Sequence, residues 1–220
     1  MGKRLASLAR RRERAARLAP RLAELYPGLA ISLGWENSLE LVVATILSAQ
    51  CTDERVNQVT PDLFRRYRTA EDYAGADIEE LEGLIHSTGF YRNKARHIRG
   101  MAARLVAEHD GEVPDSMEEL TLLPGVARKT ANVVLSNAFS KTEGVVVDTH
   151  VKRVSTRLGL TAAKTPEAIE RDLMEVLPRE AWHPFSWRLI RHGRARCDAR
   201  RPDCSGCEIS DECPSAFTFT

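Results

Sequence analysis

The residues that most strongly suggest chemistry are a lysine and the glycine turn before it. Residues 123–131 read Leu-Pro-Gly-Val-Ala-Arg-Lys-Thr-Ala, which predicts the end of one helix, a tight turn at Gly125 and a second helix with Lys129 in its first turn. Backbone N–H groups at a helix start have no partner within the helix, and the helix dipole adds positive potential, so such a turn binds anions. A lysine placed there either holds a phosphate or acts as a nucleophile whose ammonium is easier to deprotonate.

A carboxylate follows this lysine nineteen residues later, where Asp148 ends the apolar run 145–147. Asp148 can cap the next helix, and we also expect it to converge with Lys129 across a cleft. A lysine attacks a sugar carbon only as a free amine, and we expect Arg128, the helix start and partial burial to disfavour the ammonium. Asp148 would then act in the transition state, by accepting a proton or by stabilising oxocarbenium charge.

Four further residues have a spacing typical of a metal centre. Cys197, Cys204, Cys207 and Cys213 follow the pattern C-x6-C-x2-C-x5-C. Structural zinc, an iron–sulfur cluster and two disulfides are the three interpretations, and an intracellular helical protein disfavours disulfides. Zinc and a [4Fe–4S] cluster are both chemically admissible for four thiolates. The fifth cysteine, Cys51, stands apart, and we predict that it is a small buried hydrophobic residue.

Helices must position these residues, because helical periodicity dominates the sequence and strand signals are few. Hydrophobic residues make up 43% of the 220 residues and aromatic residues only 6%, a composition that favours helix over sheet. We predict helical segments at 22–26, 38–51, 77–86, 94–109, 116–122, 128–140, 150–158, 166–177 and 184–192. A capping box from Asp115 to Glu118 and the pair Thr165-Pro166 mark two helix starts. Short connections without strand–helix alternation predict an all-α fold.

Positive charge is concentrated in residues 1–21, which contain eight lysines or arginines and one glutamate, although the net charge of the whole chain is only +1. This distribution suits a polyanionic partner held on one side. Solvated helix faces and an organelle transit peptide are the alternatives for this segment. No stretch is long and apolar enough to span a bilayer, and we expect a soluble protein of the cytoplasm that does not associate with a membrane.

Together, the hairpin with Lys129, the sequence Asp148-Thr149-His150 and the cysteine array resemble the endonuclease III family, bacterial DNA glycosylase/AP lyases that remove oxidised pyrimidines. The resemblance extends from about Ser38 to Cys213. It implies that Lys129 is the nucleophile that forms a Schiff base and that Asp148 is its essential carboxylate partner. It also implies that the four clustered cysteines hold a [4Fe–4S] cluster. With four protein ligands no iron is open to substrate, so we expect a structural or redox-sensing role.

The resemblance also implies contacts to DNA phosphates. The amides around Gly125, Ala127 and Thr130 would hold one phosphate without reading a base. The family most often has glycine at position 127, and alanine is small enough to leave the turn intact. Arg200 and Arg201 would reach phosphates from the cysteine loop.

An enzyme that acts at C1′ within a duplex must extrude the nucleotide and fill the gap that it leaves. From the residues alone, Gln50 is typical of a solvated helix end and Phe90 of a loop residue that anchors the core. The resemblance instead aligns Gln50 with the gap-filling glutamine of the family and Phe90 with its wedge residue, which is often leucine.

For the architecture, the resemblance implies a two-lobed helix–hairpin–helix DNA glycosylase fold. A helical-barrel domain would span residues 32–141, with the hairpin at about 116–140. A discontinuous domain would combine 1–31 with 142–220 and carry the cluster loop, 197–213. The expected partner is double-stranded DNA with damaged pyrimidines or abasic sites, bound in the groove between the lobes by a monomer that associates with the nucleoid.

Three alternatives are open from the sequence. An adenine-specific mismatch glycosylase is disfavoured by Lys129, because related enzymes of that kind lack the lysine nucleophile. A non-catalytic DNA-binding module would need no carboxylate at Asp148. A lesion-recognition paralogue with a blocked pocket and little activity is compatible with the sequence.

Overall fold

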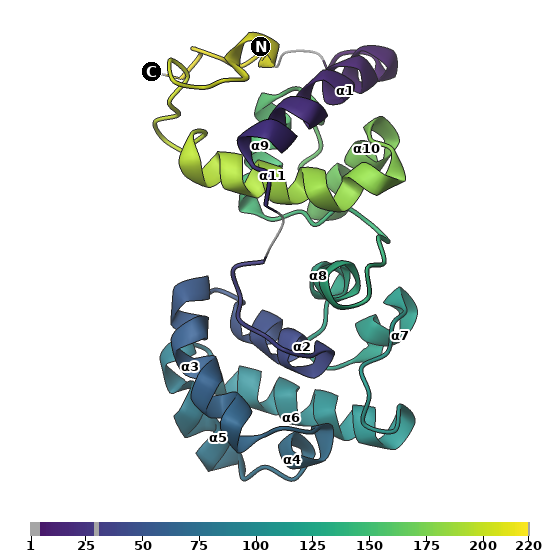
Figure 1. Cartoon of the computed structure of the whole chain (residues 1–220), viewed down its shortest axis with the longest axis vertical. Helices are drawn as coiled ribbons and strands as arrows, with labels where there is room; N and C mark the ends of the chain where they lie inside the picture. The colour runs from purple at the N-terminus through teal and green to yellow at the C-terminus, as the bar shows by residue number, and fades with distance from the viewer. Residues whose placement is uncertain (1–4, 29–30, 220) are drawn as a thin grey trace. The chain divides into compact units, whose positions relative to one another are not determined.

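The computed structural model describes residues 5–28 and 31–219, and in these ranges the regular elements are helices, with no strand (Figure 1). The expected all-α fold is therefore confirmed. The described chain divides into two compact units. Unit 1 combines residues 5–28 with 144–219, and unit 2 comprises residues 31–143.

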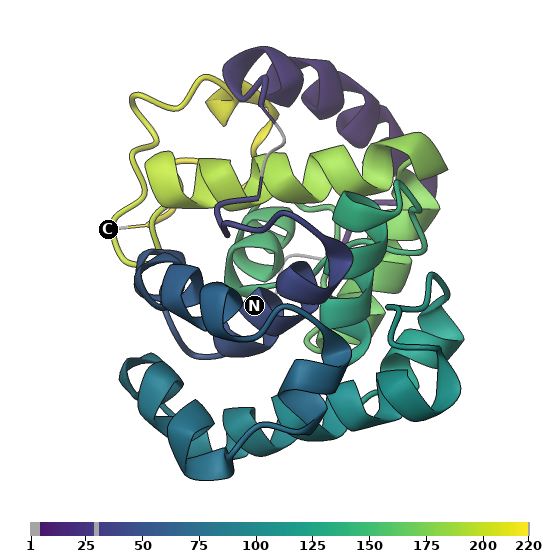
Figure 2. The ribbon, with the colours of Figure 1, turned by 60° about the horizontal axis from the view of Figure 1, so that its bottom comes forward.

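Unit 2 contains the predicted hairpin. Its elements are α2 (Ser38–Leu47), α3 (Asp53–Arg66), α4 (Ala70–Ala74), α5 (Ile78–Ile85), η1 (His86–Thr88), α6 (Tyr91–Glu108), α7 (Met117–Leu122) and α8 (Arg128–Ala138). Helix α6 contacts α2, α4 and α5, and α8 contacts α2 and α7. Figure 2 shows these helices, coloured blue to teal, from a second direction. Fully buried residues such as Leu41, Ile98 and Leu135 join them in one core.

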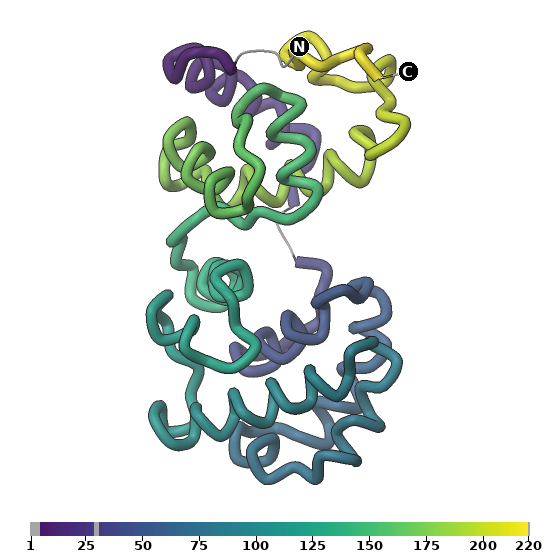
Figure 3. Tube along the Cα trace, turned by 180° about the vertical axis from the view of Figure 1, so that it is seen from behind, coloured from purple at the N-terminus to yellow at the C-terminus, as the bar shows by residue number. Residues whose placement is uncertain are grey.

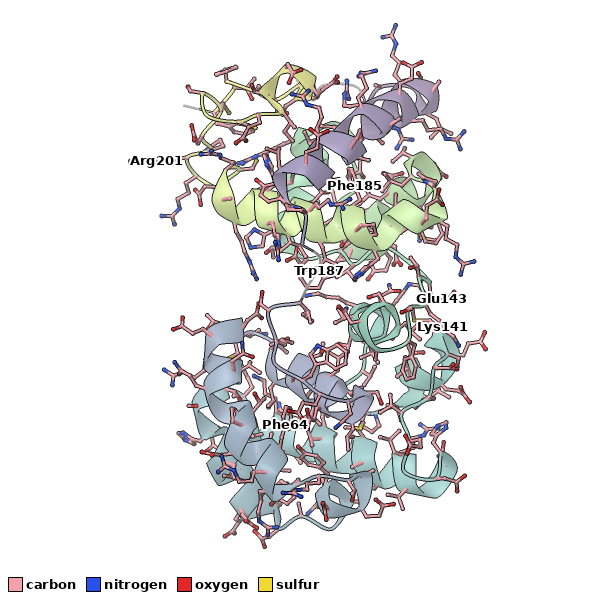
Figure 4. The ribbon with its side chains drawn as sticks, viewed as in Figure 1. Phe64, Lys141, Glu143, Phe185, Trp187 and Arg201 are labelled. Atoms are coloured by element: carbon pink, nitrogen blue, oxygen red, sulfur yellow. The ribbon has the colours of Figure 1, made fainter. Side chains whose placement is uncertain are left out.

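Unit 1 carries the cysteines. Its elements are α1 (Leu8–Leu25), α9 (Thr149–Arg157), α10 (Pro166–Val176), η2 (Arg179–Ala181), α11 (Trp182–Ala195) and η3 (Ser210–Glu212). Helix α11 contacts α1 and α9, and the core includes Leu18, Leu189 and Phe185, which Figure 4 labels on α11. Arg17 and Arg21 of the N-terminal helix bind residues of the cysteine loop that are far away in the sequence, and Figure 3 shows both segments, in purple and yellow, within unit 1.

The basic N-terminal segment is an internal part of unit 1. Helix α1 already begins at Leu8, and Arg11 is buried and donates to the carbonyl oxygen of Leu160 at 3.0 Å. Arg17 and Arg21 bind acidic residues of the cysteine loop. These three arginines therefore have partners within the protein. Neither a polyanionic partner nor full solvation is needed to explain their presence in the sequence. Residues 1–4 lie outside the described ranges.

The helix starts agree with the capping pattern, with one shift. Ser116, and not Asp115, caps α7, because its Oγ accepts from the Glu119 amide at 3.2 Å. Thr165 caps α10 as predicted, accepting from the Ala168 amide at 3.4 Å, with proline at the first helical position. Capping side chains therefore fix these boundaries to within one residue.

Two helices of unit 2, α3 and α4, were not predicted from the sequence. Thr52 caps α3 by accepting from the Arg55 amide at 3.2 Å, but Pro61 lies inside this helix and obscures the pattern. The helix forms because Val56 and Leu63 are fully buried. Tertiary packing thus outweighs local propensity here.

Candidate active site and cysteine centre

The hairpin between α7 and α8 has the predicted glycine turn. Gly125 adopts φ +79°, and a Cβ added to it would lie 2.8 Å from Cβ of His97 on α6. Pro124 packs against Gly100, which also belongs to α6. A Cβ added to Gly100 would lie 3.5 Å from Cγ of Pro124. Only glycine satisfies both the backbone conformation and the close approach, so the turn is seated tightly on α6.

Ala127 occupies the N-cap position of α8 in an extended conformation, with φ −84° and ψ 167°. An L-residue adopts this conformation without strain, so the alanine found here in place of glycine leaves the turn intact. No side chain caps the helix, and Gly125 and Ala127 are exposed while Thr130 is half-buried. The first turn of α8 therefore offers amides to an anion.

Lys129 is the second residue of α8, and its side chain is exposed. The expected partial burial is wrong, because α8 buries residues 131–135 and leaves Lys129 in solvent. An exposed amine is accessible to a large substrate such as a duplex.

Asp148, in unit 1, is the N-cap of α9. Its Oδ1 accepts from the Val151 amide at 2.7 Å, and the residue is half-buried. The capping role considered for this carboxylate is thus observed. One of its oxygens is engaged by the helix, which holds the carboxylate in a defined orientation.

A hydrogen-bond network that sequence reasoning missed links the start of α9 to the cysteine loop. Nη2 of Arg153 contacts Nδ1 of His150 at 2.9 Å and donates to the Gly193 carbonyl at the same distance, while Nε donates to the Cys197 carbonyl at 3.0 Å. Burial lowers the pKa of His150 below its ordinary value, which favours the neutral ring that can accept from the guanidinium. The i,i+3 spacing of these two residues was the only signal in the sequence.

All four clustered cysteines line one pocket, together with apolar residues such as Leu158 and Ile209. Their thiols are free, and Arg157 donates to Sγ of Cys197 at 3.2 Å. Among the described residues no three Cys, His, Asp or Glu side chains converge as a single metal ion requires. Four thiols at one pocket are the donor type that both zinc and iron–sulfur clusters use.

The protein environment disfavours the charged form of two of these thiols. Burial raises the pKa of Cys207 and of Cys213, so their thiolates need a compensating positive charge, which a metal group supplies. Cys51, by contrast, packs against the core of unit 2 as a small hydrophobic residue, and it is half-buried where the sequence predicted burial.

Gln50, three residues after the end of α2, and Phe90, the N-cap residue of α6, both have a left-handed backbone conformation, with φ +54° and +48°. Both are exposed, and 64% of Phe90 is accessible to solvent. A core-anchoring role for Phe90, which its sequence alone favoured, is therefore excluded. Non-glycine residues in this conformation are uncommon and often mark functional turns.

Arg200 and Arg201 are exposed on the cysteine loop, where Figure 4 labels Arg201. Their backbone amides donate to Oδ1 of Asp198 at 2.8 and 3.0 Å. This turn fixes the backbone and leaves both guanidinium groups in solvent.

Comparison with known proteins agrees with this geometry. The family model described as HhH-GPD superfamily base excision DNA repair protein matches residues 43–179. The Endonuclease III of a Synechocystis species is 57% identical over 212 residues, which cover 96% of this chain and 97% of that protein. The chain belongs to the endonuclease III family. The Endonuclease III of Bacillus subtilis is 44% identical over 194 residues, 88% of each chain.

Solved structures extend the family relationship to the fold. A non-covalent Endonuclease III–DNA complex and a trapped Endonuclease III–DNA covalent intermediate each match with a TM-score of 0.89 and 42% identity, covering 94% of this chain and 97% of the other. A thermostable thymine-DNA glycosylase shares the fold, with a TM-score of 0.80 at 20% identity. The chain is accordingly a DNA-binding glycosylase of base excision repair, and AP lyase activity is consistent with the family.

One property of the family bears on the cysteine loop. Endonuclease III proteins carry a [4Fe–4S] cluster. None of the described helices has the length and apolar character needed to cross a membrane.

Proposed function

We propose that this enzyme removes damaged pyrimidines from double-stranded DNA and cleaves the strand at the resulting abasic site, with Lys129 as the nucleophile. The observation that carries the proposal is the position of Lys129, exposed in the first turn of α8 directly after the Gly125 turn. The similarity to an endonuclease III trapped as a covalent DNA intermediate supports a covalent route here.

In the proposed reaction, the free amine of Lys129 forms a bond to C1′ while the bond from C1′ to the base breaks, and the base departs with that electron pair. Loss of a proton from nitrogen and opening of the sugar ring give an imine. Removal of a proton from C2′ then drives cleavage of the C3′–O bond, which nicks the strand 3′ to the abasic sugar. Water finally hydrolyses the imine and frees the lysine.

Asp148 is the proposed carboxylate partner in this sequence. Because its Oδ1 is engaged by the Val151 amide, the carboxylate is held in a fixed orientation at the start of α9. In the transition state it accepts a proton or stabilises positive charge on the sugar.

The remaining predicted residues would bind and deform the duplex. The amides at Gly125, Ala127 and Thr130 would hold one phosphate, and the exposed Arg200 and Arg201 would hold others. Gln50 would fill the gap left by the extruded nucleotide and Phe90 would act as the wedge. Their exposed left-handed turns support this assignment.

Cys197, Cys204, Cys207 and Cys213 would hold the [4Fe–4S] cluster of the family in the pocket that they line. Because protein thiolates would occupy every iron, the cluster supplies structural support or redox sensing and no open site for substrate. We further propose that a monomer acts on nucleoid DNA in the cytoplasm, with a barrel domain at 32–141 and a cluster domain formed by 1–31 and 142–220.

The test is covalent trapping on a duplex that carries a single oxidised pyrimidine. Borohydride reduces an imine to a stable amine, so the wild-type protein should become cross-linked to the DNA. Lys129→Gln should abolish the cross-link, and Lys164→Gln, at an exposed lysine of unit 1, should leave it intact. Trapping that survives Lys129→Gln would refute the assignment of the nucleophile.

The same duplex series separates the alternatives. Release of adenine from a mismatch without trapping would indicate an adenine-specific enzyme. Tight binding with neither base release nor trapping would indicate a non-catalytic clip or a lesion-recognition paralogue.

A further inference from the structure

A buried lysine of unit 2 has no role in the chemistry described above. Lys94, in the first turn of α6, is only 3% exposed. Its Nζ donates to the carbonyl oxygens of Leu47 at 2.7 Å and of Thr88 at 2.8 Å. In the described part of the chain no carboxylate forms an ion pair with it, so two backbone carbonyls stabilise a buried ammonium.

The two carbonyls belong to the ends of two different helical segments. Leu47 is the last residue of α2, three residues before Gln50, and Thr88 is the last residue of η1, two residues before Phe90. Carbonyls at helix ends lack partners within the helix and carry partial negative charge, which suits an ammonium. One cation thus bridges the two segments that lead into the exposed turns.

Each of the two turns has a strained backbone. Gln50 and Phe90 have φ of +54° and +48°, and Gly89 before Phe90 has φ +70°. A left-handed conformation at a non-glycine residue persists only where its surroundings hold it in place. The second half of α2 and the buried Thr88 provide that rigid base, and Lys94 connects them.

Burying the ammonium of Lys94 costs free energy, so a contribution to stability does not explain why a lysine occupies this position. Burial lowers the pKa of Lys94, because the charged form loses its hydration. An apolar side chain of similar length would fill the same space without removing a charge from water. A buried polar group of this kind is better explained by the geometry that it enforces.

We propose that Lys94 is a positioning residue that fixes the Gln50 turn relative to the Phe90 turn, so that both side chains can enter the duplex together. This inference rests on the proposed roles of Gln50 and Phe90. Lys94 would be a third residue that gap filling requires. It would act through the backbone carbonyls of Leu47 and Thr88 and would not contact DNA.

The variant to test is Lys94→Met, which keeps the length of the side chain and removes its three donors. The matched control is Leu105→Ala, a fully buried position near the other end of α6, which lowers stability without touching either turn. Both are assayed below their unfolding transitions, with folding verified by circular dichroism.

Two substrates separate positioning from chemistry. On a duplex with thymine glycol, Lys94→Met should lower kcat/KM for base release by about 10- to 100-fold, the loss that a misplacement of about 1 Å produces. On a single-stranded oligonucleotide with one abasic site, which needs no gap filling, cleavage and borohydride trapping should fall less than about threefold. Leu105→Ala should cleave both substrates at nearly the wild-type rate.

A fluorescence measurement reports how the Gln50 and Phe90 turns engage the duplex, and it requires no catalytic turnover. 2-Aminopurine is placed opposite a tetrahydrofuran abasic analogue, and its emission is followed at saturating protein. Lys94→Met should reduce the change seen with the wild type, whereas Leu105→Ala should reproduce it. In a Gln50→Ala/Phe90→Ala background, adding Lys94→Met should cost less than about threefold in duplex activity, because residues that act as a unit are not additive.

Each other outcome overturns the proposal. Equal losses on duplex and single-stranded substrates would assign Lys94 a general structural role, and wild-type activity on the duplex would remove it from gap filling. A wild-type protein that neither releases thymine glycol nor is trapped on the abasic strand would instead contradict the proposed function itself.

Discussion

Arg17 of α1 and Glu212 of the cysteine loop form a two-pronged ion pair, with Nε–Oε1 at 2.6 Å and Nη2–Oε2 at 3.0 Å. Glu212 directly precedes Cys213. Arg21, one helical turn further along, donates to Asp211 at 2.8 Å and to the Glu208 carbonyl. The first helix of the chain therefore binds the loop that carries the four clustered cysteines.

This contact predicts that α1 controls how firmly the loop retains its metal group. In protein isolated with its cluster, Arg17→Glu places like charges together and should speed the loss of visible cluster absorption under a chelator by about two- to fivefold, a modest effect because the pair is exposed. The charge-swapped variant Arg17→Glu/Glu212→Arg should restore the wild-type rate.

The matched control for that experiment is Arg10→Glu, on the exposed part of the same helix. If the Arg10→Glu variant loses its cluster absorption as fast as the Arg17→Glu variant, the effect comes from net charge and the contact between Arg17 and Glu212 is irrelevant.

The fastening of α1 also illustrates what the sequence could not reveal. The partners of Arg17 and Arg21 lie about 190 residues away in the chain, and no local pattern encodes such a pairing. The charge cluster was visible, but only the fold shows that Arg17 and Arg21 pair with acidic residues of the cysteine loop. The glycine turn at 125 was predictable, because its signal is contained within nine consecutive residues.

The candidate site shows the same division between local and distant information. The cap role of Asp148 follows from its place before a helix, and the structure bears it out. The exposure of Lys129 depends on which side of α8 packs against the core, and the expected burial was therefore wrong. Lys94 was missed because its role appears only when two turns, forty residues apart, are seen together.

The conformation of Gly125 predicts a sharp cost for any side chain there. Gly125→Ala should destabilise the protein by about 1–3 kcal/mol, since it combines a φ of +79° with a Cβ 2.8 Å from Cβ of His97. Urea unfolding measures the stability, and binding to an abasic-analogue duplex should weaken as the turn shifts.

The neighbouring Ala127 offers the control, because its φ of −84° suits alanine and glycine alike. Ala127→Gly should change stability by only a few tenths of a kcal/mol and preserve DNA binding. If Gly125→Ala and Ala127→Gly lose comparable amounts of stability and DNA binding, the backbone at Gly125 is not specially constrained.

Asp148 has a structural and a proposed catalytic role that one substitution can separate. Asn caps a helix about as well as Asp, so Asp148→Asn should preserve the hydrogen bond to the Val151 amide and the melting temperature. Single-turnover base release should nevertheless fall by about 10²- to 10⁴-fold, because an amide cannot accept the proton.

Asp148→Ala completes that comparison, since it should lose the cap as well and lower stability by about 1 kcal/mol. If Asp148→Asn retains turnover, the residue is only a cap, and the positive charge must be stabilised elsewhere.

The capping box of α4 predicts part of the response to acid. Asp72 Oδ2 accepts from the backbone amides of Arg68 at 2.8 Å and Thr69 at 3.1 Å, and these hydrogen bonds lower the pKa of the carboxyl below its ordinary value. A carboxyl whose pKa is depressed in the folded state stabilises the protein above the pKa of the unfolded chain, near 3.9. That stability is lost as the pH falls through the pKa that Asp72 has in the folded protein.

The urea midpoint of Asp72→Asn should therefore lie below that of the wild type at pH 7, and the difference should shrink below about pH 4. A difference that is constant from pH 7 to pH 2.5 would mean that the charge on Asp72 contributes nothing and that only its hydrogen-bonding shape matters.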